Sequence, residues 1–187
     1  MSIDEHALVI VPGYGNSGPE HWQTLLEQSH DKALRVIQEN WSRPMRGQWV
    51  KALDHAVQNL DSPSILVGHS AGAMTIVHWA SRAASSSNVV GALLVAPPDM
   101  EAALPGMPPP WMVRLAGWAP IPLQRLPWKS IVVASSNDLM CSIARSQDFA
   151  RAWGSRFVDL GPAGHINPEA GFGAWPQARS LIESLAA

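Results

Sequence analysis

The chain has 187 residues, of which 47% are hydrophobic and 15% are charged, and its formal net charge is −2. This length can bury a core that needs no disulfide or metal to hold it. The 13 lysines and arginines are scattered, which argues against a nucleic-acid partner, and no apolar stretch reaches the roughly 20 residues of a membrane span.

The first 13 residues predict a short core strand that ends at Pro12-Gly13. They do not resemble a secretory signal, because acidic residues stand where a signal peptide carries basic ones. The single cysteine, Cys141, allows no disulfide within the chain, which is typical of a reducing compartment. We therefore expect a cytoplasmic protein in which residues 1–187 form one domain.

Short apolar runs alternate with segments of helical periodicity along the chain. The predicted strands are residues 7–11, 34–37, 64–67, 89–95, 130–134 and 156–160. The predicted helices are residues 20–29, 49–60, 71–84, 142–153 and 175–185. Strands separated by helices form parallel sheets covered on both faces, so the pattern predicts an α/β protein, a three-layer α/β/α sandwich with about six parallel strands.

Residues 97–127 interrupt this alternation with nine prolines. A loop of this length inside a compact domain is usually functional or disordered, and its tryptophans favour order. We interpret it as an irregular excursion at one end of the sheet, which either lines a functional site or covers the domain passively. In the first case Trp111, Trp118 and the neighbouring Trp128 would shape an apolar pocket.

A candidate nucleophile lies in the sequence Gly68-His69-Ser70-Ala71-Gly72, between a predicted strand and a predicted helix. A G-x-S-x-G pattern in this context is typical of a sharp turn that holds a serine in a strained backbone conformation and exposes its hydroxyl. The small flanking residues let the turn approach neighbouring backbone. The context therefore favours a nucleophilic Ser70 over an inert serine in a glycine-rich turn.

A serine hydroxyl needs a general base at neutral pH. In chains with this turn, an acidic residue and then a histidine follow the serine. Among seven histidines, only His165 lies beyond the last predicted strand, in a loop rich in turn-forming residues. We predict that His165 is the base.

The acidic partner is predicted at Asp138, just past the strand at 130–134, at the edge of a parallel sheet where functional sites collect. It would fix the tautomer of the histidine. The alternative is Asp159, which lies within the last strand and is less well placed to reach over the edge. Ser136 and Asn137 either orient the carboxylate or only form the turn.

Acyl transfer also needs two backbone N–H groups that stabilise the oxyanion. One is predicted at Ala71, directly after the nucleophile, and the other at Tyr14, on the loop after the first strand. Gly13 and His69, beside these groups, and Trp111 from the excursion are the predicted substrate contacts.

Four segments in this order resemble the small single-domain serine hydrolases related to retinoblastoma-binding protein 9, especially their bacterial branch: VPGYGNSGPEHWQ, GHSAG, SSNDLMCS and GHINPEAGFGAWP. The resemblance implies a minimal α/β-hydrolase fold that lacks the first two strands, with strand order 2-1-3-4-5-6 and with Ser70, Asp138 and His165 as the triad. The run His21-Trp22-Gln23 belongs to it, and forms either a pocket wall or a packing and capping set.

The predicted function is therefore hydrolysis of carboxylic ester-type bonds in a small acyl substrate through an acyl-enzyme, with thioester or amide cleavage as neighbouring possibilities. This chemistry requires no metal and no cofactor. Two alternatives belong to other classes. One is a protein-interaction module on a hydrolase scaffold with a secondary or vestigial triad. The other is a flavodoxin-like cofactor binder, which is disfavoured because no G-x-G-x-x-G follows the first strand.

Overall fold

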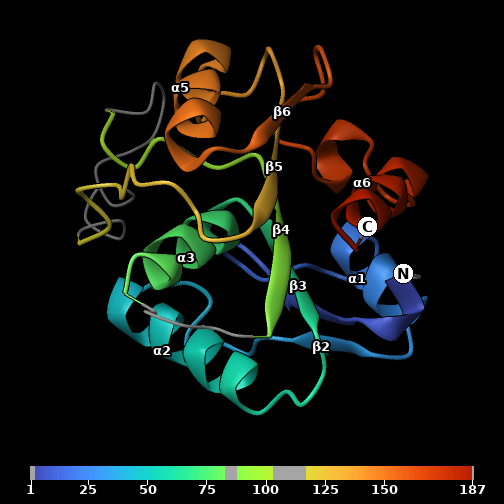
Figure 1. Cartoon of the computed structure of the whole chain (residues 1–187). Helices are drawn as coiled ribbons and strands as arrows, with labels where there is room; N and C mark the ends of the chain where they lie inside the picture. Colours follow the sequence, from blue (N-terminus) through green and yellow to red (C-terminus); the bar gives the residue numbers. More distant parts are fainter. Residues whose placement is uncertain (1–2, 83–87, 103–116, 187) are drawn as a thin grey trace.

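The computed structural model describes residues 3–82, 88–102 and 117–186. Its centre is one sheet of six parallel strands in the order β2-β1-β3-β4-β5-β6, as predicted (Figure 1). The strands are β1 (Ala7–Val11), β2 (Ala33–Arg35), β3 (Ser64–His69), β4 (Val89–Val95), β5 (Lys129–Ala134) and β6 (Arg156–Asp159).

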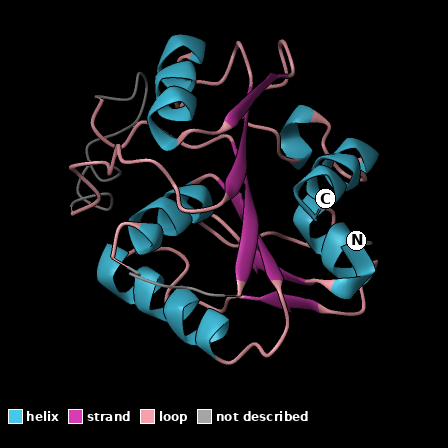
Figure 2. Ribbon diagram, in the orientation of Figure 1, coloured by secondary structure: helices cyan, strands magenta, loops and turns pink. Residues whose placement is uncertain are grey.

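Helices cover both faces of the sheet, which confirms the three-layer prediction (Figure 2). One face carries α2 (Arg46–Gln58), α3 (Ala71–Ala80) and α5 (Ile143–Trp153). The other carries α1 (Trp22–Gln28) and α6 (Pro176–Ala186), with the short 3-10 turns η1 (Ile3–Glu5) and η2 (Pro168–Ala170). None of the helices that the structure describes has the length and apolar character needed to cross a membrane.

The central strands are buried along their whole length because helices pack on both of their faces. Every residue of β1 and of β3 is buried. Two separate hydrophobic cores result, one on each side of the sheet. The core under α2, α3 and α5 includes Trp49, Met74 and Phe149, and the core under α1 and α6 includes Trp22 and Ile182. Continuous apolar runs are expected for strands in this position.

Several element boundaries differ from the predicted ones for local reasons. The first helix starts at Trp22 because the side chain of His21 accepts a hydrogen bond from the amide of Gln23 and caps the helix. The helix α5 starts after Ser142, whose hydroxyl accepts from the amide of Arg145. It ends at Trp153, and the next residue, Gly154, caps it in a left-handed conformation.

The tryptophans at the end of the 97–127 excursion point into the core. Trp118 is fully buried, packs edge-to-face on Trp49 and donates its indole N–H to the Pro44 carbonyl at 2.8 Å. Trp128 stacks on Trp79. The prediction that Trp118 shapes a substrate pocket is therefore wrong, since a large buried ring with a satisfied N–H stabilises the core. Trp128 also packs against this core, but it is only half-buried, and its indole N–H has no hydrogen-bond partner among the described residues. Trp111 lies outside the described residues.

Candidate active site

The backbone turns sharply at Ser70, between β3 and α3. Ser70 has φ 54° and ψ −126°, a conformation that L-residues rarely adopt. The turn is so tight that a Cβ on Gly72 would lie 1.9 Å from the carbonyl oxygen of Val11. A Cβ on Gly68 would lie 2.7 Å from the Cα of Ala73. Both positions therefore require glycine, and together they leave room for the strained serine.

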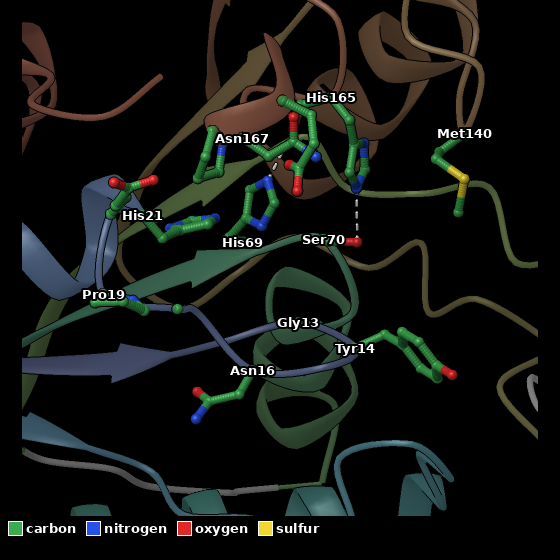
Figure 3. A pocket seen from close by; sticks show the side chains of 14 residues that line it. Gly13, Tyr14, Asn16, Pro19, His21, His69, Ser70, Met140, His165 and Asn167 are labelled. Carbon is green, nitrogen blue, oxygen red and sulfur yellow. Dashed lines mark hydrogen bonds between the residues drawn. The ribbon is translucent and has the colours of Figure 1, made fainter. Parts of the chain in front are cut away.

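Three side chains from distant parts of the sequence form one hydrogen-bonded chain at the carboxyl edge of the sheet. The Nε2 atom of His165 lies 2.9 Å from the Ser70 Oγ (Figure 3). Its Nδ1 lies 2.8 Å from Oδ2 of Asp138. With the proton of Nδ1 donated to the carboxylate, Nε2 is free to accept the serine proton. Asp159 instead accepts from the amide of Gly161 in an exposed turn, so the alternative acid is not at the site.

The carboxylate of Asp138 is held by its own loop. Its side chain is 4% exposed, and its second oxygen, Oδ1, accepts from the amide of Met140 at 2.8 Å. Cys141, the next residue, is a buried thiol, and burial raises its pKa to about 11. A thiol that stays protonated is a poor nucleophile, so Cys141 does not compete with Ser70.

The loop that carries His165 is tied to the end of β5 by Ser135 and Asn137. Oδ1 of Asn137 accepts from the amide of Gly164 at 2.7 Å and from the hydroxyl of Ser135 at 2.8 Å. The Ser135 oxygen in turn accepts from the amide of Ala163 at 2.9 Å. Of the two roles considered for Asn137, the structure shows a positioning one, although it positions the histidine loop and not the carboxylate.

The same loop is fixed from the other side by the His21-Trp22-Gln23 run and by His69. The indole N–H of Trp22 donates to the Ile166 carbonyl at 3.0 Å, and Nε2 of His69 donates to the His165 carbonyl at 2.8 Å. Gln23 is fully buried and donates to the carbonyls of Val11 and Val67. The run therefore both packs the first helix and fixes the site, so the two interpretations of it are compatible.

His69 serves this role as a neutral imidazole. Its side chain is buried, and burial followed by the nearby rings of His165 and His21 holds its pKa well below the ordinary histidine value. A neutral ring with its proton on Nε2 can donate to a carbonyl without placing a charge beside His165.

The predicted oxyanion donors lie on either side of the nucleophile. Ala71 is the first residue of α3, where helix amides have no partner within the helix. Tyr14 follows Gly13 on the loop after β1, and this loop passes so close to the nucleophile that a Cβ on Gly13 would lie 2.9 Å from Cβ of Ser70. The loop that carries Tyr14 therefore passes directly beside the nucleophile turn that carries Ala71.

Arg35, at the edge strand β2, holds the loop after β1 in place. Its guanidinium donates to Oδ1 of Asn16 at 2.8 Å and to the carbonyl of Ser17 at 3.0 Å. It also forms an ion pair with Glu27 of α1. The sequence contains no recognisable signal for this clamp, because the arginine lies about 20 residues beyond the loop that it holds.

These groups face a cleft of about 540 Å³. The residues that line it are Gly13, Tyr14, Asn16, Gly18, Pro19, Glu20, His21, His69, Ser70, Met140, His165, Asn167, Pro168 and Glu169. Tyr14 and Met140 lie on one side of Ser70, and His69 and then His21 lie on the other (Figure 3). Two of the predicted substrate contacts, Gly13 and His69, therefore line the cleft. In the parts of the chain that the structure describes, no group of three or more histidine, cysteine or acidic residues could hold a metal ion.

Comparisons with known proteins agree with this fold and place the chain in a family. The sequence model of a family described as serine hydrolase matches residues 8–184. A YdeN-like hydrolase of Pectobacterium atrosepticum has a similar structure, with a TM-score of 0.83 and 32% identity over 97% of this chain and 90% of that one. No curated protein matches the sequence.

More distant structures share the fold. The ydeN gene product of B. subtilis has a TM-score of 0.79 and 20% identity, over 96% of this chain and 98% of that one. Est1E of Butyrivibrio proteoclasticus, solved with bound ferulic acid, has a TM-score of 0.73 and 11% identity, over 98% and 89% of the two chains. The relation to retinoblastoma-binding protein 9 is not among these findings and stays a prediction.

Proposed function

The chain belongs to the serine hydrolase family, and on that premise we propose that it cleaves carboxylic esters of small molecules by acyl transfer to Ser70. The observation that carries the proposal is the continuous hydrogen-bonded chain from Ser70 through His165 to Asp138, with contacts of 2.9 and 2.8 Å. A serine in a strained turn, within reach of a histidine of defined tautomer, is the arrangement that nucleophilic catalysis requires.

In the first step, Oγ of Ser70 attacks the carbonyl carbon while Nε2 of His165 takes the hydroxyl proton. The amides of Ala71 and Tyr14 stabilise the oxyanion, and one such donor typically contributes about 2.7–4 kcal/mol to the transition state. The carbon–oxygen bond to the alcohol then breaks as His165 donates its proton to the leaving oxygen. In the second step, water attacks the acyl-enzyme, and the same proton transfers release the acid and restore Ser70.

The cleft supports a small substrate. A volume of about 540 Å³ lies within the usual range of small-molecule sites. Esters and thioesters are favoured over amides, because an amine is a poorer leaving group and needs stronger protonation.

A fluorophosphonate probe tests this proposal, because it phosphonylates only an activated serine. Intact mass should show a single adduct on the wild type and none on Ser70→Ala. The exposed Ser136, two residues before Asp138, provides a matched control, and Ser136→Ala should still be labelled. A folded wild type that takes no adduct, or an adduct that persists on Ser70→Ala, would overturn the proposal. A labelled enzyme would then be assayed on esters, thioesters and amides of one acid.

A further inference from the structure

His21 places a hydrogen-bond donor in the cleft. The residue is only 5% exposed, yet it is part of the cleft lining. Its Nδ1 accepts from the amide of Gln23 at 3.1 Å, so the ring proton of the neutral form is on Nε2. Within the described part of the chain, no group accepts a hydrogen bond from this Nε2–H.

The ring stays neutral under ordinary conditions. Burial, followed by the charge of the Arg35 guanidinium, lowers the pKa of His21 to about 4, although Glu169 acts in the opposite direction. At neutral pH the side chain therefore offers one fixed N–H and no charge. An uncharged N–H group of this kind is better suited to an uncharged oxygen acceptor than to an anionic one.

His21 lies at a defined place relative to the proposed chemistry. Its ring packs against that of His69 with 4.8 Å between centroids, and the His69 ring is 5.1 Å from that of His165. The three imidazoles form a row that leads along the cleft away from Ser70 (Figure 3). The two spacings, 4.8 and 5.1 Å, place the His21 ring no more than 9.9 Å from that of His165, which a substrate arm of several bonds can span.

The surroundings of His21 define the chemistry of this end of the cleft. Pro19 and Pro168 contribute apolar lining, and the exposed carboxylates of Glu20 and Glu169 lie at its rim. These carboxylates disfavour an anionic arm, because like charges in a partly enclosed site repel. An apolar arm would displace water from the Nε2–H and leave a buried donor without a partner, which is unfavourable.

We propose that His21 is a specificity-determining residue whose Nε2–H donates a hydrogen bond to an uncharged oxygen, such as a keto or second ester carbonyl, on an arm of the substrate. The inference rests on the proposed ester hydrolysis and names the kind of ester that the cleft prefers. A neutral hydrogen bond of this kind corresponds to roughly 2- to 12-fold in affinity.

Two isosteric pairs of esters test the inference, one for each side of the scissile bond. Ethyl 4-oxopentanoate is compared with ethyl 4-methylpentanoate, and 3-oxobutyl acetate with 3-methylbutyl acetate. In at least one pair the wild type should prefer the ketone by about 3- to 10-fold in kcat/KM. The preference should disappear in His21→Asn. Asparagine is itself a favoured helix cap. The variant therefore keeps an acceptor for the amide of Gln23 but removes the imidazole Nε2–H that reaches into the cleft.

His55→Asn is the matched control, because it makes the same substitution at an exposed position on α2 and should leave the preference unchanged. Equal loss of activity on both members of each pair in His21→Asn would show that the residue only caps the helix and would overturn the inference. A His21-dependent preference for monoethyl succinate would also overturn it, because that arm is charged.

Binding to Ser70→Ala separates this inference from the proposed function. The same ester pairs are titrated by NMR into Ser70→Ala and into the double variant with His21→Asn, where no turnover is needed. A binding preference for the ketone that depends on His21 supports the inference even if the wild type hydrolyses none of these esters. The absence of hydrolysis would count only against the proposed ester hydrolysis. Equal affinities within both pairs would overturn the inference even if hydrolysis is observed.

Discussion

The nucleophile turn and the two loops that carry its partners are held by different physical means. Ser70 is positioned by steric exclusion, because the strand, the turn and the helix are in direct contact at Gly68 and Gly72. Gly68, Ser70 and Gly72 lie within five positions of one another, so the turn itself is a local structure. Its close packing requires that Gly68 and Gly72 carry no side chain, because Gly68 faces Ala73 of the same turn and Gly72 faces the backbone of β1.

The loops at Asp138 and His165 are instead positioned by hydrogen bonds between distant residues. Asn137 holds the Gly164 amide across 27 positions, and Trp22 holds the Ile166 carbonyl across 144. Each bond contributes modestly to stability, but each sets the direction of the imidazole. Changes in the turn should therefore affect folding most, whereas changes in the loops should affect activity more than stability.

The largest expected effect is that of Gly72→Ala. The new Cβ would lie 1.9 Å from a main-chain oxygen of β1, so backbone in the centre of the sheet must move. We expect a loss of at least about 4 kcal/mol in the free energy of unfolding, measured by urea denaturation. Gly47→Ala on α2 is the control, since open space surrounds it and alanine favours the helix by up to about 1 kcal/mol. Wild-type stability of Gly72→Ala would contradict the steric account.

Asn137→Ala should have the next largest effect, and mainly on catalysis. Without the amide oxygen the Gly164 amide loses its partner, and a displacement of His165 by about 1 Å can lower kcat about 100-fold. We expect KM to change much less. Asn137→Asp keeps an acceptor oxygen in the same place and should restore most of the activity. Equal kcat values for the wild type and Asn137→Ala would show that the hydrogen bond from Gly164 to Asn137 is not needed to position His165.

The contrast between turn and loops also explains which features could be predicted from the sequence. Strands β1 and β4 were predicted with their observed bounds, because buried parallel strands are continuous apolar runs between turn residues. The positions of Ser70, Asp138 and His165 follow from their places after β3, after β5 and beyond β6. Parallel strands bring their carboxyl ends to one edge, so the topology alone brings these residues near each other.

The remaining features depend on contacts that have no local signal. The tie from Trp22 to the His165 loop requires knowledge of how α1 lies against a segment near the other end of the chain. Trp118 was misplaced for the same reason, since proline-rich composition marks an irregular segment without indicating which way its rings point. The sequence suggested that His21 either caps the first helix or forms a wall of the pocket, but it did not indicate that one side chain does both.

Trp22→Phe should have a smaller effect than Asn137→Ala. Phenylalanine preserves most of the ring packing but leaves the buried carbonyl of Ile166 without its donor. We expect a loss of about 1–2 kcal/mol in the free energy of unfolding and a decrease in kcat of up to about 10-fold. Trp175→Phe is the control, because Trp175 packs edge-to-face on Trp22 while no described carbonyl of the histidine loop accepts its N–H. Equal effects of both variants would indicate that packing alone matters.

The smallest expected effect is the loss of stability at acidic pH that results from a histidine on α3, the helix that follows the nucleophile turn. His78 on α3 is buried, and burial followed by the charges of Arg46 and Arg82 lowers its pKa to about 4. Because the unfolded chain takes up this proton near pH 6.5 and the folded chain does not, the stabilisation is present above pH 6.5 and is lost as the pH falls toward 4. His78→Gln cannot titrate, so between pH 6 and 5 it should lose about 1 kcal/mol less than the wild type in the free energy of unfolding, measured by urea denaturation at each pH. If both proteins lose the same amount, the acid sensitivity belongs to other buried groups, and the helix behind the nucleophile tolerates a charged imidazole.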